Sequence, residues 1–243
     1  MLYIIGLGLG DKTDITVKGL EKVKLCDIIY LEYYTSKLAT SVEELEKYYK
    51  KKIIVADRTR VEHANDILKH AKSKNVALLI IGDPFSATTH TTFLTEAKKQ
   101  NITVEVIHNT SILTAVGSTG LFLYNFGKTT SIPFDNKNIT TPIEVLKMNQ
   151  KNNLHTLMLL DLDPVNNTFM TSSQAMKYVL KHNINPKTKT VICAGLGTKE
   201  QTIKVGTLEQ LQELEIRVFH QCIIITGKKL HFAEEEALAL YDS

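Results

Sequence analysis

An unbroken apolar run in the middle of the chain, Leu78–Ile81, constrains the fold more than any other stretch. It predicts a buried strand that must end at Gly82-Asp83-Pro84, because Pro84 fixes its own φ angle and has no N–H for a sheet hydrogen bond. A loop of small and hydroxyl-bearing residues follows, and a helical pattern begins at Thr91. In an open α/β sheet, ligands bind at the carboxyl ends of the strands. The stretch therefore indicates either a ligand site that contains Asp83 or an ordinary strand-to-helix turn that Asp83 caps.

Strand and helix patterns alternate in the same way along residues 1–127. The strands expected there are 2–5, 27–31, 52–56, 76–81 and 103–107. This alternation predicts an α/β domain with a parallel five-stranded sheet. After an extended polar connection, residues 128–243 predict a second α/β domain with a mixed sheet. Two units of similar size favour a cleft between them as the site of a small ligand.

Composition excludes several classes of protein. The 243 residues are 43% hydrophobic and 23% charged, which suits one large or two small globular domains. No segment approaches the roughly 18 uninterrupted apolar residues of a membrane span, and the first residues lack the basic region of a signal peptide. A net charge of +3 without a long basic run does not indicate nucleic-acid binding. The scattered Cys26, Cys193 and Cys222 favour reduced thiols in the cytoplasm and argue against a zinc site.

A glycine-rich turn, Gly6-Leu7-Gly8-Leu9-Gly10, follows the first expected strand. Alternating glycines allow the backbone to approach a ligand closely. A nicotinamide-dependent oxidoreductase is one alternative, since Glu32 stands about where a ribose-binding acid would. However, the glycine spacing departs from that of dinucleotide-binding motifs, and the next helix begins only after Thr16, too late for its N-terminus to meet a pyrophosphate.

Other expected strand ends carry loop signals of the same kind. Ser111 lies between the strand 103–107 and a helix of small residues. In the second half, Leu160-Asp161 ends one strand, Gly195-Leu196-Gly197 follows another, and His220 begins a third. These residues are candidates for a ligand site. The sequence shows no Ser-His-Asp order, paired carboxylates or metal-ligand spacing that would add a catalytic group.

Several longer motifs resemble those of one enzyme family. They are Gly6-Leu7-Gly8-Leu9-Gly10-Asp11, Gly82-Asp83-Pro84-Phe85, Ala87-Thr88-Thr89-His90 and Val106-Ile107-His108-Asn109. From Met1 almost to its last residue, the chain resembles the diphthine synthases, methyltransferases of diphthamide biosynthesis within the tetrapyrrole-methylase-like superfamily. The resemblance implies two α/β domains with S-adenosylmethionine in the cleft between them, usually in a homodimer. It implies no metal, no nucleic acid and no membrane.

The resemblance also implies the reaction. Methyl groups pass from S-adenosylmethionine, leaving S-adenosylhomocysteine, to a 3-amino-3-carboxypropyl-histidine of translation elongation factor 2 in the cytoplasm. They build a trimethylammonium on the amino group, and eukaryotic members also methylate a carboxylate. The implied cofactor contacts, mostly from backbone groups, are Leu9, Asp83, Ser86, Ser111, Ile112, Leu160, Leu196 and His220. His90 and His108 are expected to be structural, and no general base is assigned.

The chain departs from the family pattern in two places. Ser86 stands where the family usually has glycine, and the stretch between Leu162 and Thr171 is shorter than in eukaryotic members. These departures leave open a protein that binds the cofactor without turnover. A superfamily sibling acting on a tetrapyrrole or on ribosomal RNA is a further alternative, against which the Gly-Asp-Pro-Phe motif and the lack of a basic stripe argue. An apolar helix over 112–126 is the predicted dimer interface.

Overall fold

The computed structural model describes residues 1–243 except 37, 64, 87–89 and 242–243. The first three residues of the Ala-Thr-Thr-His motif, Ala87, Thr88 and Thr89, therefore lie outside the described residues. The chain divides into two compact units, Met1–Leu113 and Thr114–Ser243, so the division falls earlier than the boundary predicted after residue 127. The two α/β units of the predicted fold class are confirmed, and each is described by itself.

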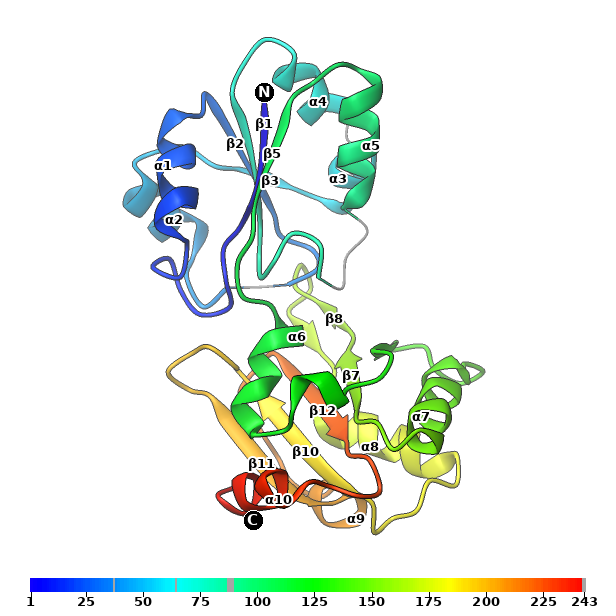
Figure 1. Ribbon diagram of the computed structural model, residues 1–243. Coiled ribbons are helices and arrows are strands. Elements are labelled where there is room, and N and C mark those ends of the chain that lie inside the picture. The colour runs from blue at the N-terminus through cyan, green and yellow to red at the C-terminus, as the bar shows by residue number, and fades with distance from the viewer. Residues whose placement is uncertain (37, 64, 87–89, 242–243) are drawn as a thin grey trace. The chain divides into compact units, whose positions relative to one another are not determined.

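Unit 1 is built on a five-stranded sheet in the order β3-β2-β4-β1-β5, and all of its neighbouring strands are parallel. The strands are β1 (Leu2–Gly6), β2 (Ile28–Glu32), β3 (Ile54–Ala56), β4 (Val76–Ile80) and β5 (Val104–Ile107). The helices are α1 (Val17–Leu25), α2 (Val42–Tyr49), α3 (Arg58–His63), α4 (Asn65–Ala71) and α5 (Thr91–Lys99). Figure 1 shows α1 and α2 on one face of this sheet and α3, α4 and α5 on the other.

The local sequence explains how these elements form. Every residue of the central strand β4 is buried, as expected of a parallel strand covered by helices on both faces. Thr16 caps α1 as predicted, because its side chain accepts a hydrogen bond from the Gly19 N–H at 3.0 Å. Two apolar clusters, one on each face of the sheet, form the core of unit 1.

Unit 2 has a mixed five-stranded sheet in the order β11-β10-β12-β7-β6, in which only the pair β6–β7 is parallel. The strands are β6 (Thr130–Ile132), β7 (Thr156–Leu160), β10 (Lys189–Ala194), β11 (Thr202–Thr207) and β12 (Gln221–Ile225). A hairpin of β8 (Leu162–Asp163) and β9 (Thr168–Phe169) stands apart from the sheet. The helices are α7 (Thr141–Lys151), α8 (Ser172–Lys181), α9 (Leu208–Leu211) and α10 (Phe232–Ala239).

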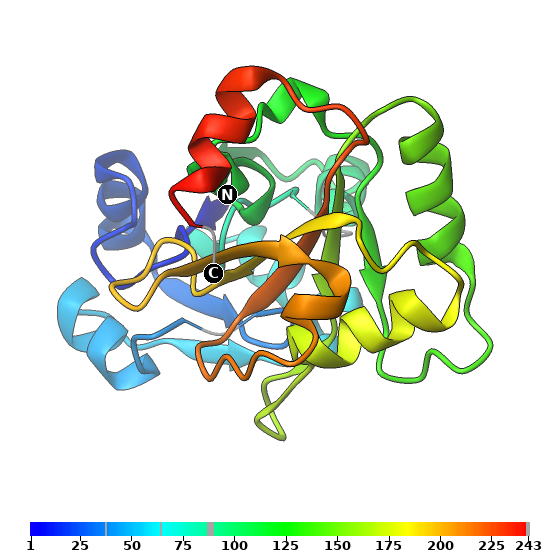
Figure 2. The same ribbon diagram turned by 90° about the horizontal axis from the view of Figure 1, so that it is seen from below.

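The predicted helix over 112–126 is wrong beyond its first turn. Helix α6 ends at Ala115, and 3₁₀ turns follow at 116–119 and 123–125. Gly120 has a φ of 85°, and a Cβ atom there would overlap Ala237 of α10. The Phe122 N–H also donates to Glu234 of α10 at 2.9 Å. These contacts explain why unit 2 begins before residue 127. Figure 2 shows red α10 beside the green segment.

No helix in the described part of the chain is both long enough and apolar enough to cross a bilayer.

Candidate functional site

Two loops of unit 1 pair at the carboxyl ends of the central strands β1 and β4. The Gly8 N–H donates to the Gly82 carbonyl at 3.2 Å, and the Gly82 N–H donates back to the Gly8 carbonyl at 2.8 Å. Both glycines lie in the left-handed region, with φ angles of 77° and 80°. This conformation favours glycine, which explains why the motifs after β1 and β4 both contain it.

Gly82 is buried, and the space beside it is large enough for a Cβ atom. A Cβ atom built there would find no neighbour closer than 3.8 Å, and its nearest neighbours would be Leu9, Ser111 and the Thr110 carbonyl. We call this space, bounded by Leu9, Thr110 and Ser111, the Gly82 cradle. Two predicted contact residues, Leu9 and Ser111, therefore meet at one place although a hundred residues separate them in the chain. A backbone that carries no side chain at this point suits close approach of a flat or extended cofactor.

Asp83, the next residue, holds the loops after β4 and β5 together. Its Oδ1 accepts the Phe85 N–H at 3.0 Å and the Ser86 hydroxyl at 3.4 Å. Its Oδ2 pairs with His108 Nδ1 at 2.8 Å and accepts the Asn109 N–H at 3.2 Å. Burial alone would raise the pKa of Asp83, but hydrogen bonds from Phe85, His108 and Asn109 lower it overall, so the carboxylate stays ionised.

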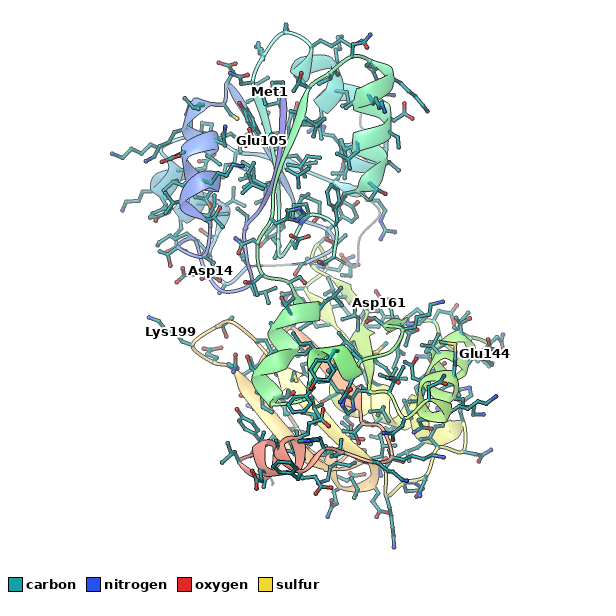
Figure 3. The ribbon with its side chains drawn as sticks, in the orientation of Figure 1. Met1, Asp14, Glu105, Glu144, Asp161 and Lys199 are labelled. Atoms are coloured by element: carbon teal, nitrogen blue, oxygen red, sulfur yellow. The ribbon has the colours of Figure 1, made fainter. Side chains whose placement is uncertain are left out.

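The loop after β5 is also tied to the loop after β1. The Asn109 side-chain amide donates to the carbonyls of Gly6 and Asp14, at 3.0 Å in each case. Three strand ends are thereby fixed relative to one another by side chains of Asp83 and Asn109. The side chain of Asp14, labelled in Figure 3 in the loop that follows β1, accepts the Gly10 N–H at 2.7 Å.

Ser86, where the family usually has glycine, fits without a left-handed backbone, since its φ is not positive. Its N–H donates to the Asp83 carbonyl at 3.3 Å, and the residue is half-buried. Ser111 is 5% exposed and Ile112, which begins α6, is half-buried. Unit 1 therefore gathers Leu9, Asp83, Ser86 and Ser111 of the predicted set around the ends of β1, β4 and β5.

The predicted cofactor contacts in unit 2 also lie close together. They stand at one end of strands β7, β10 and β12, which we call the sheet edge. Strands β10 and β12 are antiparallel, as are β12 and β7, so the end of β10, the start of β12 and the end of β7 coincide. The Gly195 N–H donates to the His220 carbonyl at 2.8 Å, which joins the turn holding Leu196 to the residue before β12. Leu196 and Leu160 are both buried. The Phe169 ring from β9 packs edge-on against His220 at 5.4 Å between ring centroids.

Gln221 is a residue of this edge that the sequence interpretation missed. Its side-chain N–H groups donate to the carbonyls of Ile216 at 2.7 Å and Val218 at 2.9 Å, and its oxygen accepts the Ser172 N–H at 2.7 Å. The amide thus fixes the loop that leads into His220. The sequence signal that could have identified Gln221 is an amide side chain at the start of an apolar strand. A buried amide there must find hydrogen-bond partners.

Asp161 closes the edge next to Leu160. Its two oxygens accept the backbone N–H groups of Phe134 and Leu162, each at 2.9 Å, so its role in unit 2 is to hold loops (Figure 3). Among the described residues, no three His, Cys, Asp or Glu side chains are grouped closely enough to hold a metal ion.

Comparison with known proteins sets the class of this chain. Residues 1–212 match the family model described as tetrapyrrole (corrin/porphyrin) methylases. The chain is 42% identical to the diphthine methyl ester synthase of Bos taurus, with 99% of this chain and 95% of the relative covered. It is 41% identical to the enzyme of that name from Saccharomyces cerevisiae, with 98% and 88% covered.

A solved structure agrees with these relatives. A crystal structure of a diphthine synthase matches with a TM-score of 0.93 and 38% identity, and covers 99% of this chain and 95% of that one. This chain belongs to the tetrapyrrole methylase family and, within it, to the diphthine methyl ester synthases. The resemblance stated from the motifs is confirmed.

Proposed function

We propose that this protein is an S-adenosylmethionine-dependent methyltransferase of diphthamide biosynthesis that methylates the 3-amino-3-carboxypropyl-histidine of translation elongation factor 2. Sequence and structural similarity along nearly the whole chain supports this activity. The single structural observation that carries the proposal is the Gly82 cradle at the carboxyl ends of the central strands, beside Leu9 and Ser111. Strand ends of this kind are where open α/β sheets bind their ligands.

The proposed cofactor contacts are the eight residues of the sequence analysis. In unit 1, Leu9, Ser111 and Ile112 would offer backbone groups around the Gly82 cradle, and Asp83 and Ser86 would shape the loop beside it. In unit 2, Leu160, Leu196 and His220 share one sheet edge. When bound, the cofactor supplies a methyl group already activated on a sulfonium. The chain itself must therefore align the acceptor and exclude water rather than provide strong chemical activation.

The proposal also covers the partners of the protein and its location in the cell. The protein substrate is elongation factor 2, the protein acts in the cytoplasm without metal, membrane or nucleic acid, and it forms a homodimer. The wholly reduced cysteines among the described residues are in keeping with a cytoplasmic protein.

The direct test is a methyl-transfer assay with labelled S-adenosylmethionine and elongation factor 2 from cells that lack the activity, read by intact mass. We expect mass steps of one methyl, confined to the modified histidine. Cofactor binding by calorimetry without any transfer would instead support a binding protein without turnover. Failure to bind the cofactor would overturn the proposed site.

Replacing Gly82 by alanine tests the cradle. The new methyl group would contact Leu9, Thr110 and Ser111 and occupy the Gly82 cradle, so we expect cofactor affinity to fall at least tenfold in calorimetric titration. The left-handed φ of 80° adds a stability cost of about 1–2 kcal/mol.

The matched control is Asn101→Ala, because Asn101 also has a left-handed φ, is exposed, and precedes β5 at the opposite edge of the same sheet. It should show a similar stability cost and unchanged affinity. An equal loss of affinity in both variants would contradict the cradle.

A further inference from the structure

Asp83 and His108 form a carboxylate–imidazole pair at the ends of β4 and β5. His108 Nδ1 lies 2.8 Å from Asp83 Oδ2, although β1 runs between the two strands. The two side chains differ sharply in exposure, with 11% for Asp83 and 67% for His108. A buried carboxylate thus holds one nitrogen of an imidazole whose remaining surface faces outward.

The surroundings fix which nitrogen carries the hydrogen. Asp83 Oδ2 already accepts the Asn109 N–H, so it acts as an acceptor, and His108 Nδ1 must donate to it. In the neutral ring, the lone pair then lies on Nε2, on the far side of the imidazole from Asp83. The Phe85 ring stands at 6.2 Å between centroids, in an edge-on arrangement, and restricts the tilt of the imidazole. The result is an oriented, outward-facing proton acceptor.

We propose that His108 is the general base of the N-methylation steps, with Asp83 as its positioning residue. This inference rests on the proposed function. Nε2 takes one proton from the ammonium group of the substrate and becomes part of an imidazolium. The freed nitrogen forms the new N–C bond as the S–C bond breaks, and the electron pair of that bond stays on sulfur. The imidazolium then returns its proton to water, so each N-methylation releases one proton.

Exposure, which would be a drawback in a small-molecule enzyme, fits a base that must reach a side chain carried by another protein. His108 also lies three residues before Ser111, in the loop that borders the Gly82 cradle. The base and the cofactor contact therefore belong to one short segment. Methylation of a carboxylate releases no proton, so the base should matter for N-methylation and not for ester formation.

The neighbouring elements carry the carboxylates of Asp83 after β4, of Asp11 and Asp14 after β1, and of Glu105 on β5, which pairs with Lys18 and Lys22. Asp83 faces His108 directly, and its negative charge stabilises the imidazolium that forms. Asp14 follows β1, and its side chain is held by the Gly10 N–H while its carbonyl accepts from Asn109. The positive charge of the protonated base is thus balanced by Asp83.

The test is His108→Asn, because the asparagine amide can donate to Asp83 from nearly the position of Nδ1 but offers no base at Nε2. At pH 7 we expect N-methylation to fall about 100-fold. Cofactor affinity by calorimetry and the thermal midpoint should stay near those of the unaltered protein. The deficit should shrink as pH rises, because the free amine then forms without help. Ester formation on a substrate that is already trimethylated should be unchanged.

Two further measurements distinguish a general base from a residue that only holds the loop in place. In His108→Ala, added imidazole should restore part of the rate, since the site is exposed. Nitrogen-15 NMR of the cofactor-free protein should show His108 as the Nδ1–H tautomer. A native rate and pH profile in His108→Asn, or an Nε2–H tautomer, would overturn this inference and leave the proposed function standing. Absence of methyl transfer by the unaltered protein would overturn both.

Discussion

Replacement of Glu234 by alanine is expected to destabilise the protein by about 3–5 kcal/mol, because it removes a buried carboxylate and leaves several hydrogen-bond donors unpaired. Glu234 lies in the first turn of α10 and is 1% exposed. Its Oε1 lies 3.0 Å from Nε2 of His155, which is equally buried, and also accepts the Phe122 N–H. Its Oε2 accepts the His231 N–H at 2.9 Å. Alanine would leave all of these donors without an acceptor, and denaturant unfolding should show the loss.

The matched control is Glu235→Ala in the same helical turn. Glu235 is exposed, so its replacement should cost less than about 1 kcal/mol through the helix dipole. Similar losses for the two variants would contradict the assigned role of Glu234. The hydrogen bond from the Gly227 N–H to His155 Nδ1 at 3.0 Å strengthens the case, because it obliges His155 to donate from Nε2 to Glu234.

The same carboxylate gives the stability a dependence on pH. Burial alone would raise the pKa of Glu234, but hydrogen bonds from His231, Phe122, His155 and Asn125 lower it overall from its ordinary value of 4.5. A lowered pKa in the folded state means that the ionised group stabilises the fold above about pH 4.5, and that this contribution disappears as pH falls through the folded value. The stability of Glu234→Gln should therefore fall less steeply between pH 5 and pH 3.

The strands could be predicted because their signals are local. The apolar run of β4 ends at Gly82-Asp83-Pro84, where the geometry of proline forbids continuation whatever the rest of the chain does. The end of the helix predicted over 112–126 could not be found from local signals. Its small apolar residues suit a helix, but Gly120 packs against Ala237, more than a hundred residues further along. The start of unit 2 depends on that distant contact.

The site shows the same limit. Ser111 was a candidate because it follows a predicted strand, and Leu9 was implied by the family resemblance. A parallel sheet brings its strand ends to one edge. Which side chains then pair depends on strand order. Asp83 reaches His108 only because β4 and β5 flank β1, an order that periodicity does not reveal. His108 was therefore expected to be merely structural, and Asp83 was assigned to the cofactor without its partner.

Asp83→Asn is expected to lower N-methylation at pH 7 by about 100-fold while changing cofactor affinity less than tenfold. Asparagine has nearly the same shape, but its neutral amide lacks the negative charge that stabilises protonated His108. Either orientation also turns an NH₂ group toward a backbone N–H, of Phe85 or of Asn109, at a stability cost of about 1–3 kcal/mol. Single-turnover rates and calorimetric titration measure the two effects separately.

Asp83→Ala should behave differently, because it releases the loops after both β4 and β5 and so weakens cofactor binding as well as turnover. The decisive comparison is the double variant Asp83→Asn with His108→Asn. If Asp83 acts through His108, the double variant loses no more N-methylation rate than His108→Asn alone, since the charge has no imidazolium left to stabilise. Rate losses that multiply would show that Asp83 acts on the cofactor independently, as the sequence alone suggested.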